Sequence, residues 1–223
     1  MNRQLITTAD GSHSIYLSEF DEHYHSVHGA IQESEHVFIR AGFDFVSSGQ
    51  NPLNLLEIGF GTGLNALLTY LNHQKNPERT INYTAIEAFP LETAIASQLN
   101  YPELLNSEAA TEVFNLLHQS EWNQAVSISS HFTITKLETT IQAYHPSNKF
   151  HLIYFDAFAP TAQPELWTAD VFSKMFDSLK KGGILTTYCA KGIVKRTLKE
   201  VGFKVESLQG PIGKREMTRA LKI

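Results

Sequence analysis

The stretch LNLLEIGFGTGLNALL, residues 53–68, decides the fold of this chain. Its first part, residues 53–58, is rich in leucine and isoleucine with Glu57 as the one charge, and it predicts a buried strand. A turn with three glycines follows at residues 59–63, and an apolar run at 64–70 predicts a helix. Because glycine has no Cβ, the backbone can turn sharply there and approach a ligand closely. A strand, a glycine turn and a helix in this order are typical of the first unit of a nucleotide-binding α/β domain.

The spacing of the glycines indicates the kind of ligand. A dinucleotide-binding turn reads GxGxxG, whereas Glu57, Gly59, Gly61 and Gly63 form the pattern ExGxGxG. This pattern resembles motif I of the S-adenosylmethionine-dependent methyltransferases, and the resemblance implies that these residues bind that cofactor. A tight turn without a ligand is the alternative, but three alternating glycines after a buried strand exceed what such a turn needs.

The length and composition of the chain favour one globular domain with an extension. A chain of 223 residues is long enough to bury one sizeable core. No apolar run approaches the roughly 20 residues that span a bilayer, and residues 1–11 lack the apolar segment of a signal peptide. The single cysteine, Cys189, excludes an internal disulfide and suits a reducing compartment. We therefore expect a cytoplasmic protein that does not contact a membrane.

Charge is distributed unevenly along the chain. The formal net charge is −5, which argues against a protein that coats nucleic acid without specificity. Residues 171–223 carry 12 Lys and Arg against 4 Asp and Glu, a balance of +8, while residues 1–170 have a balance of −13. A basic C-terminal third on an acidic protein predicts either one face that binds an anion or solvated basic helix faces.

Residues 1–50 are expected to form an N-terminal extension and lid ahead of the main domain at residues 51–223. Two short runs, residues 4–8 and 14–18, flank the turn at Asp10-Gly11 and predict a β-hairpin. No internal repeat or low-complexity linker interrupts the rest of the chain, so we expect one domain with this extension.

Residues 24–36 combine histidines with small polar and aromatic side chains. The histidines at positions 25, 28 and 36 have no cysteine or regular i, i+4 pairing that would indicate a metal site, and we expect none. Polar residues beside Tyr24 favour a lid that faces the ligand, with Tyr24 in contact with the substrate.

The remainder of the chain alternates strand and helix patterns, which is typical of a parallel sheet covered by helices. Strands are predicted at residues 81–86, 131–135, 150–155, 184–189, 203–208 and 216–223. A helix with Thr168 as an N-cap is predicted within residues 164–180, the turn at 181–183 ends it, and another helix follows at 193–201. Residues 100–128 predict no definite element.

Glu87 follows the second predicted strand of the domain, about 25 residues after the glycine turn. A carboxylate at this position accepts two hydrogen bonds from a ribose diol. Methyltransferases and dehydrogenases both place an acid here, so Glu87 indicates an adenosine ligand without deciding the chemistry.

Four further segments resemble one family in particular. The segments are DAFAPTAQPELWTADVFSKM at residues 156–175, LKKGGILTTYCAKGIVKRTLKEVGF at 179–203, GPIGKREMTRA at 210–220 and HGAIQESEHVFI at 28–39. The first three are similar to the methyltransferase domain of the MnmC family of bacterial tRNA wobble-uridine modification enzymes. The fourth resembles the N-terminal signature of that domain, in which Glu-Ser precedes a Val-Phe pair. The resemblance covers almost the whole chain.

The resemblance implies an α/β fold of the class I S-adenosylmethionine-dependent methyltransferases. Such a fold is Rossmann-like, with a seven-stranded sheet whose last strand is antiparallel. The cofactor would be S-adenosyl-L-methionine, bound by Glu33 and Ser34 as well as by the glycine turn and Glu87. Where the family usually has Gly-Asp, at the end of the third strand, this chain has Leu137-Glu138, so Glu138 is expected to contact the adenine.

The implied reaction converts aminomethyl-(2-thio)uridine at the tRNA wobble position to methylaminomethyl-(2-thio)uridine. Bifunctional members of the family carry a C-terminal flavin oxidase domain, and this chain ends at Ile223 without one. The resemblance is therefore to a stand-alone form, and it leaves open a separate oxidase as a partner beside the tRNA.

Asp156 directly follows the predicted central strand 150–155, at the end where such sheets open a crevice. An amine must be neutral to accept a methyl group, and a carboxylate orients its N–H groups and stabilises the developing charge. Phe158 is expected to stack on the uracil, and Pro160 to stiffen the loop. The alternative is that Asp156 caps the next segment and Phe158 belongs to the core. Trp167 either packs under the loop or touches the nucleoside.

Lys214 and Arg215 lie in a predicted loop within the family-like sequence KREM, and we expect them to contact tRNA phosphates. The alternative phosphate contacts are on one predicted helix, at Lys191, Lys195, Arg196 and Lys199. Phosphate contacts from either set would make tRNA binding sensitive to salt.

Three other functions are compatible with parts of the sequence. The first is an S-adenosylmethionine-dependent N-methyltransferase of a small-molecule amine, which would share the adenosine-binding half. The second is a nicotinamide-dependent dehydrogenase, which the glycine spacing disfavours. The third is a non-catalytic nucleotide-binding subunit, which the acid in DAFAP disfavours.

Overall fold

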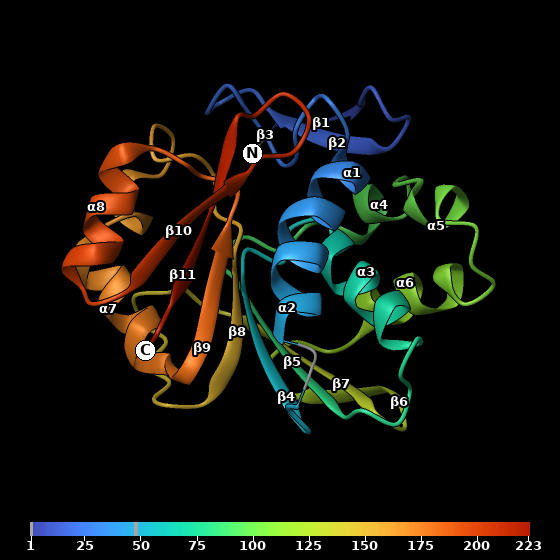
Figure 1. The fold of residues 1–223 in the computed structure, drawn as a ribbon. Helices are drawn as coiled ribbons and strands as arrows, with labels where there is room; N and C mark the ends of the chain where they lie inside the picture. Colours follow the sequence, from blue (N-terminus) through green and yellow to red (C-terminus); the bar gives the residue numbers. More distant parts are fainter. Residues whose placement is uncertain (1, 47–48) are drawn as a thin grey trace.

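A large mixed sheet positions the candidate site. A computed structural model describes residues 2–46 and 49–223 of the protein. In this part of the chain the sheet has eight strands in the order β10-β11-β9-β8-β4-β5-β7-β6 (Figure 1). The strands are β4 (Leu53–Ile58), β5 (Ile81–Glu87), β6 (Ala125–Ser129), β7 (Phe132–Glu138), β8 (Phe150–Phe155), β9 (Leu179–Thr187), β10 (Lys204–Gln209) and β11 (Glu216–Leu221).

The pairing of the strands confirms the predicted class I fold. Strands β7, β5, β4, β8 and β9 run parallel to one another, whereas β11 pairs antiparallel with both β9 and β10. Among the described residues the sheet has one strand more than the seven expected. The additional strand is β6, which pairs antiparallel with β7 at the edge. Its short sequence, AVSIS, belongs to a region in which no definite element was predicted.

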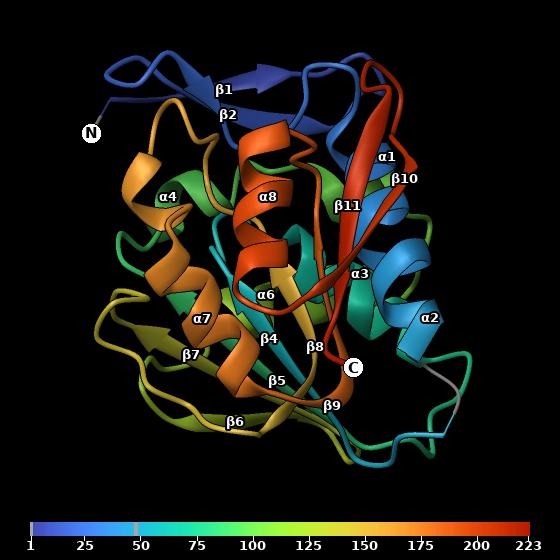
Figure 2. The ribbon, with the colours of Figure 1, turned by 60° about the vertical axis from the view of Figure 1, so that its left-hand side comes forward.

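Helices cover both faces of the large sheet (Figures 1 and 2). One face packs against α3 (Leu64–His73), α6 (Ala110–Gln119) and a continuous helical segment of α1 (Ala30–Ser34), π-helical η1 (Glu35–Phe43) and α2 (Asp44–Val46). The other face packs against α7 (Ala169–Ser178) and α8 (Gly192–Glu200). The short elements are α4 (Thr93–Ala96), α5 (Tyr101–Leu104) and the 3-10 turn η2 (Pro164–Leu166). Because both faces are covered, β8 is buried along its whole length.

A second, three-stranded sheet lies across the carboxyl ends of the parallel strands, at the top of Figures 1 and 2. It consists of β1 (Arg3–Thr7), β2 (His13–Leu17) and β3 (Glu22–His23), and the β1–β2 pair confirms the predicted hairpin. The Arg3 guanidinium ties this sheet to the main domain by donating to the carbonyls of Phe89 at 2.8 Å and Pro90 at 3.2 Å. The small sheet therefore covers the edge at which ligands bind in α/β sheets. The division of the chain at residue 50 stays a prediction.

The helix predicted at residues 164–180 is wrong in its extent. After η2 the chain breaks at Thr168, which is the N-cap of α7 as predicted. The helix ends at Ser178 because Leu179 is already extended and pairs with β8. The two glycines at 182 and 183 therefore lie inside β9 and do not form the helix C-terminal turn.

The helical segment at residues 30–46 was not predicted as a helix. Its apolar residues Val37, Phe38, Ile39 and Phe43 are buried against the sheet. Three of them are consecutive, so the sequence shows a short apolar run instead of the spaced stripe that indicates a helix. Packing against the sheet decides the conformation here.

Candidate active site

The glycine turn between β4 and α3 adopts a conformation that other residues take only with strain. Gly59, Gly61 and Gly63 have φ angles of 88°, 48° and 73°. A Cβ at Gly59 would lie 2.7 Å from the carbonyl oxygen of Asp156, and a Cβ at Gly61 would lie 3.1 Å from the ring of Tyr24. The glycines thus let the turn pass close to the end of β8 and to the N-terminal segment.

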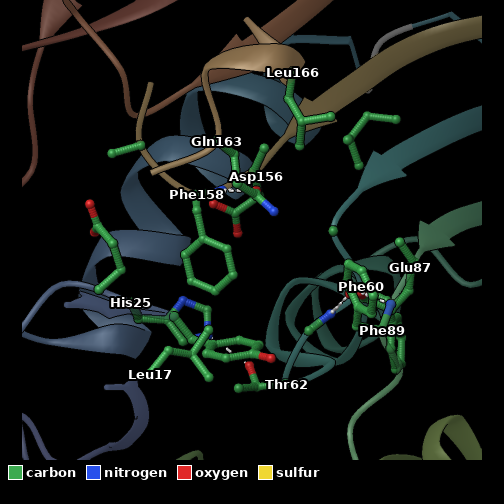
Figure 3. A pocket seen from close by; sticks show the side chains of 18 of the residues that line it. Leu17, His25, Phe60, Thr62, Glu87, Phe89, Asp156, Phe158, Gln163 and Leu166 are labelled. Atoms are coloured by element: carbon green, nitrogen blue, oxygen red, sulfur yellow. Dashed lines mark hydrogen bonds between the residues drawn. The ribbon is translucent and has the colours of Figure 1, made fainter. Parts of the chain in front are cut away.

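A cavity of about 650 Å³ opens at the carboxyl ends of β4, β5 and β8 (Figure 3). The predicted site residues that line it are Tyr24, Glu33, Gly59, Gly61, Glu87, Asp156, Phe158 and Lys214. In Figure 3, Asp156 and Phe158 lie toward one side of the cavity and Glu87 and Phe89 toward the other. The cavity therefore has an aspartate end and a Glu87 end.

At one end, Glu87 is held in the cavity wall by two backbone amides. One carboxylate oxygen accepts from the Gly61 amide at 3.0 Å, and the other accepts from the Phe89 amide at 2.9 Å. Ile86, Phe89 and Ile141 supply apolar surface to the same wall. A fixed carboxylate beside apolar side chains suits an adenosine, whose diol donates hydrogen bonds and whose base packs on apolar surface.

At the other end, Asp156 projects from the end of β8. Its Oδ2 accepts a hydrogen bond of 2.8 Å from Asn65 Nδ2. Burial, with a smaller contribution from the charge of Glu33, raises the pKa of Asp156 to about 7, against the opposing effects of Asn65 and Lys214. The carboxyl group therefore exchanges a proton near neutral pH, which suits a side chain that takes a proton from an amine.

Asn65 connects Asp156 to Glu57 and was not predicted as a site residue. Its Nδ2 also donates to Glu57 Oε1 at 3.0 Å. Glu57 is completely buried beneath the cavity, and this burial raises its pKa well above the usual range. Glu57 does not line the cavity and contacts its wall through Asn65. The sequence contained one signal that could have identified Asn65: it is a polar residue in the first turn of α3, directly after the glycines.

The loop after β8 is fixed from beneath by Trp167. Its indole Nε1 donates to the carbonyl of Phe158 at 2.8 Å, while the ring packs on aromatic residues of the core. Trp167 is only 7% exposed and does not line the cavity, so its position fits support of the loop. The ring of Phe158 meets that of Tyr24 edge to face, with centroids 5.1 Å apart. Pro160 lies in the same loop but outside the cavity wall.

Lys214 reaches into the cavity and forms an ion pair with Glu33. Its ammonium nitrogen also lies 4.0 Å from the centre of the Tyr188 ring. The second carboxylate oxygen of Glu33 accepts from the Ser26 amide at 2.8 Å. The ion pair therefore fastens the N-terminal segment to the β10–β11 loop, and it places a positive charge where it opposes the rise in the pKa of Asp156.

The remaining predicted residues lie outside the cavity wall. Ser34 is completely buried in α1, and Gly63 is the N-cap of α3. Glu138 is exposed at the end of β7, and residues 139–142 line the cavity in its place. Arg215 is exposed in the β10–β11 loop.

Two neutral histidines hold the glycine turn. His25 Nε2 lies 2.7 Å from Thr62 Oγ1, and His118 Nε2 lies 3.0 Å from the carbonyl oxygen of Thr62. Burial lowers the pKa of each histidine to about 4. The described residues contain no group of three or more His, Cys, Asp or Glu side chains placed to hold a metal ion. Within residues 2–46 and 49–223, no helix is long and apolar enough to cross a membrane.

The sheet order, the glycine turn and the fixed carboxylate of Glu87 define a class I methyltransferase with a site for S-adenosyl-L-methionine. The residues present fit that cofactor, because a Cβ at Gly61 would fill the space between the turn and Tyr24. A family model described as S-adenosyl-L-methionine-dependent methyltransferase matches residues 104–223. The chain belongs to this family.

Curated relatives are similar to nearly the whole chain. A protein of Leptospira interrogans named tRNA 5-methylaminomethyl-2-thiouridine biosynthesis bifunctional protein MnmC is 32% identical over 209 residues, which is 89% of this chain and 32% of the relative. The protein of the same name from Cupriavidus necator is 30% identical over 217 residues, which is 92% of this chain and 32% of the relative. The chain thus spans about a third of the length of these relatives.

Solved structures agree with this similarity. The crystal structure of MNMC2 from Aquifex aeolicus superposes with a TM-score of 0.82 at 25% identity, covering 100% of this chain and 70% of that one. A spermidine synthase from Thermotoga maritima has a TM-score of 0.54 at 13% identity, over 99% of this chain and 71% of that one, which shows only a shared fold.

Proposed function

We infer that this enzyme methylates the aminomethyl group of a modified wobble uridine in tRNA. The substrate would be aminomethyl-(2-thio)uridine and the product methylaminomethyl-(2-thio)uridine. Similarity to proteins named for the biosynthesis of 5-methylaminomethyl-2-thiouridine supports this proposal. The chemistry of the cavity supports it separately, because a carboxyl group that titrates near neutral pH lies beside an aromatic wall.

The raised pKa of Asp156 is the observation that carries the proposal. A primary amine is mainly an ammonium ion at neutral pH and has no lone pair to donate. Ionised Asp156 removes one proton from that nitrogen, which leaves a neutral amine and a protonated carboxyl group. When bound, S-adenosylmethionine supplies an electrophilic methyl group on a sulfonium. The product nitrogen then carries the positive charge, and Asp156 releases its proton to solvent.

Other residues hold the reactants in place. Phe158 and Tyr24 present ring surface on which a uracil packs beside Asp156. Trp167 fixes the backbone position of Phe158 through the hydrogen bond to its carbonyl. Glu87 would accept from the ribose of the cofactor, with the backbone of the glycine turn at its methionine part. The proposed cofactor contacts of Ser34 and Glu138 have less support, since neither lines the cavity.

The tRNA is the proposed partner, and a separate oxidase that prepares the aminomethyl group stays a prediction. A tRNA substrate also implies a reaction in the cytoplasm, which likewise stays a prediction.

A methyl-transfer assay tests the proposed function. Purified enzyme and labelled S-adenosylmethionine are incubated with tRNA that carries aminomethyl-uridine, with the same tRNA carrying an unmodified wobble uridine, and with free small amines. The proposal predicts transfer to the aminomethyl tRNA and none to the unmodified tRNA or to the free small amines. Transfer to the free amines alone, or to none of these acceptors, would refute it.

A further inference from the structure

A second cleft opens beside the active-site cavity and has no role in the chemistry described above. Its volume is about 530 Å³, and it lies between the outer face of the α1–η1 segment and the loop of residues 209–215 that joins β10 to β11. Gln32, His36 and Arg40 line one side, spaced four residues apart on the helical segment. Lys214 lines both this cleft and the active-site cavity, so the two spaces are neighbours.

The cleft is basic, and two of its cations have no ion-pair partner in the described chain. Arg40 and Arg215 are both exposed, and neither forms an ion pair or a hydrogen bond within residues 2–46 and 49–223. No acidic residue is among the described residues that line the cleft. Lys214 differs from the two arginines, because its ammonium is already paired with Glu33. The charge available to a ligand therefore comes from the guanidinium groups.

The loop that lines the other side of the cleft has two backbone amides without an acceptor in the described chain. The amides of Ile212 and Gly213 donate to no acceptor in the part of the chain that the structure describes, and both residues are exposed. Gly213 has a φ of 85°, and a Cβ there would lie 2.1 Å from the ring of His28, so the loop is packed tightly onto the N-terminal segment. Free amides next to guanidinium groups suit a phosphate oxygen.

The two walls of the cleft are tied together. The side chain of His36 on η1 donates from Nε2 to the carbonyl of Gln209 at 2.8 Å, since a carbonyl oxygen can only accept. Together with the packing of Gly213 on His28, this bond fixes the loop relative to the helix. The cleft is therefore formed before a ligand arrives, which reduces the ordering cost of binding.

We propose that this cleft binds a phosphodiester of the substrate RNA adjacent to the target nucleotide, with Arg40 and Arg215 as its ligands. The proposal rests on the RNA substrate of the proposed function. Because Lys214 lines both the cleft and the cavity, we assign the phosphate in the cleft to the RNA whose nucleoside enters the cavity. A base inserted toward Asp156 leaves its sugar–phosphate backbone at the cavity mouth, beside the cleft. The contact carries no sequence information and positions the RNA.

The test compares an RNA substrate with a substrate that has no phosphate. Methyl transfer by wild type, Arg40→Gln, Arg215→Gln and the double variant is measured on an anticodon stem-loop and on the free aminomethyl-uridine nucleoside. We expect kcat/KM on the stem-loop to fall about tenfold for each arginine, with kcat/KM on the nucleoside unchanged. The control is Lys181→Gln, an exposed basic residue near the start of β9 that lines neither space, and it should change neither value. Arg196→Gln tests the alternative phosphate contacts on α8.

A binding measurement tests the proposed phosphate contact even if no methyl transfer is detected. The slope of log affinity for the stem-loop against log salt should become shallower by roughly 0.7 to 0.9 for each lost phosphate contact. Arg40→Lys and Arg215→Lys keep the charge and should restore most of the slope. If the wild-type enzyme methylates no acceptor, the proposed function is refuted. The salt slopes still test whether the cleft binds a phosphate.

Chemical removal of the phosphate charge identifies the contact. A methylphosphonate on one side of the target nucleotide should weaken wild-type binding as much as the arginine substitutions do, with no further loss in the double variant. The proposed phosphate contact is refuted if the arginine variants lower kcat/KM equally on the nucleoside and the stem-loop. Unchanged salt slopes in Arg40→Gln and Arg215→Gln, or a shallower slope in Arg196→Gln alone, would also refute it.

Discussion

Replacing Asp156 by Asn separates a chemical role of this residue from a structural one. The substitution keeps the size of the side chain and an oxygen that accepts from Asn65, but it removes the group that takes up a proton. The chemical step should slow by about 100-fold or more, the usual contribution of a positioned acid–base group. Affinity for S-adenosylmethionine should be retained, because its contacts are proposed at Glu87, at the other side of the cavity, and at the backbone of the glycine turn, which the substitution does not change.

The raised pKa of Asp156 also predicts how the rate depends on pH. Below pH 7 the carboxyl group is mainly protonated and cannot accept a proton, so the wild-type rate of the chemical step should rise with pH through about 7. Asp156→Asn should lose this rise.

The same pKa predicts the effect on stability. Unfolded, Asp156 titrates at its ordinary value of 3.8, whereas in the folded protein it titrates at about 7. Between these values the folded state binds more protons, so this group lowers the free energy of unfolding as pH rises across that window. The loss amounts to roughly 2 to 3 kcal/mol between about pH 5 and pH 8. Asp156→Asn should therefore gain stability relative to wild type as pH rises.

Two measurements on one preparation test this reasoning. Single-turnover methyl transfer gives the chemical rate, and urea unfolding at both pH values gives the stability difference. Asp170→Asn is the control, since Asp170 is exposed in the first turn of α7 and lies outside the cavity, and it should leave the rate unchanged. A normal single-turnover rate in folded Asp156→Asn, accompanied by a loss of stability at both pH values, would refute the catalytic role.

Three further substitutions test the site. Gly61→Val places a branched side chain at a φ of 48° and against the ring of Tyr24, so cofactor binding by calorimetry should fall at least tenfold; wild-type affinity would mean that the turn does not bind the cofactor. Lys214→Met removes a positive charge that lowers the pKa of Asp156, so the rise of the rate with pH should move up by roughly one unit. An unmoved or lower midpoint in the pH profile would contradict this assignment. Asn65→Leu removes the amide donor to Asp156, so kcat should fall about tenfold while the KM for the cofactor stays unchanged. If both values stay at the wild-type level, the bridge has no part in the chemistry.

Much of the fold was predictable because strong local patterns agree with the tertiary structure. The run LNLLEI and the glycines that follow it allow few conformations, and β4, the turn and α3 lie where residues 53–70 predict them. The elements that were missed depend on distant partners. The apolar run at residues 37–39 is helical because it packs on the sheet, and Leu179 leaves its helix because β8 is available to pair with it.

The candidate site was predictable where a residue follows directly from a strand end. Glu87 ends β5 and Asp156 directly follows β8, the two parallel strands on either side of β4, and sheet topology brings both residues to one cavity. Asn65 could not be identified in this way, since its role depends on the distance between its amide and two carboxyl groups from different strands. The pairing of Lys214 with Glu33, 181 residues away in sequence, likewise depends on the folded chain.

The most direct measurement of the proposed function is mass spectrometry of wobble nucleosides from cells that lack this gene. In these cells aminomethyl-(2-thio)uridine should accumulate and methylaminomethyl-(2-thio)uridine should disappear, and the wild-type gene should restore the product whereas Asp156→Asn should not. Unchanged methylaminomethyl-(2-thio)uridine in the deleted cells would contradict the proposed reaction.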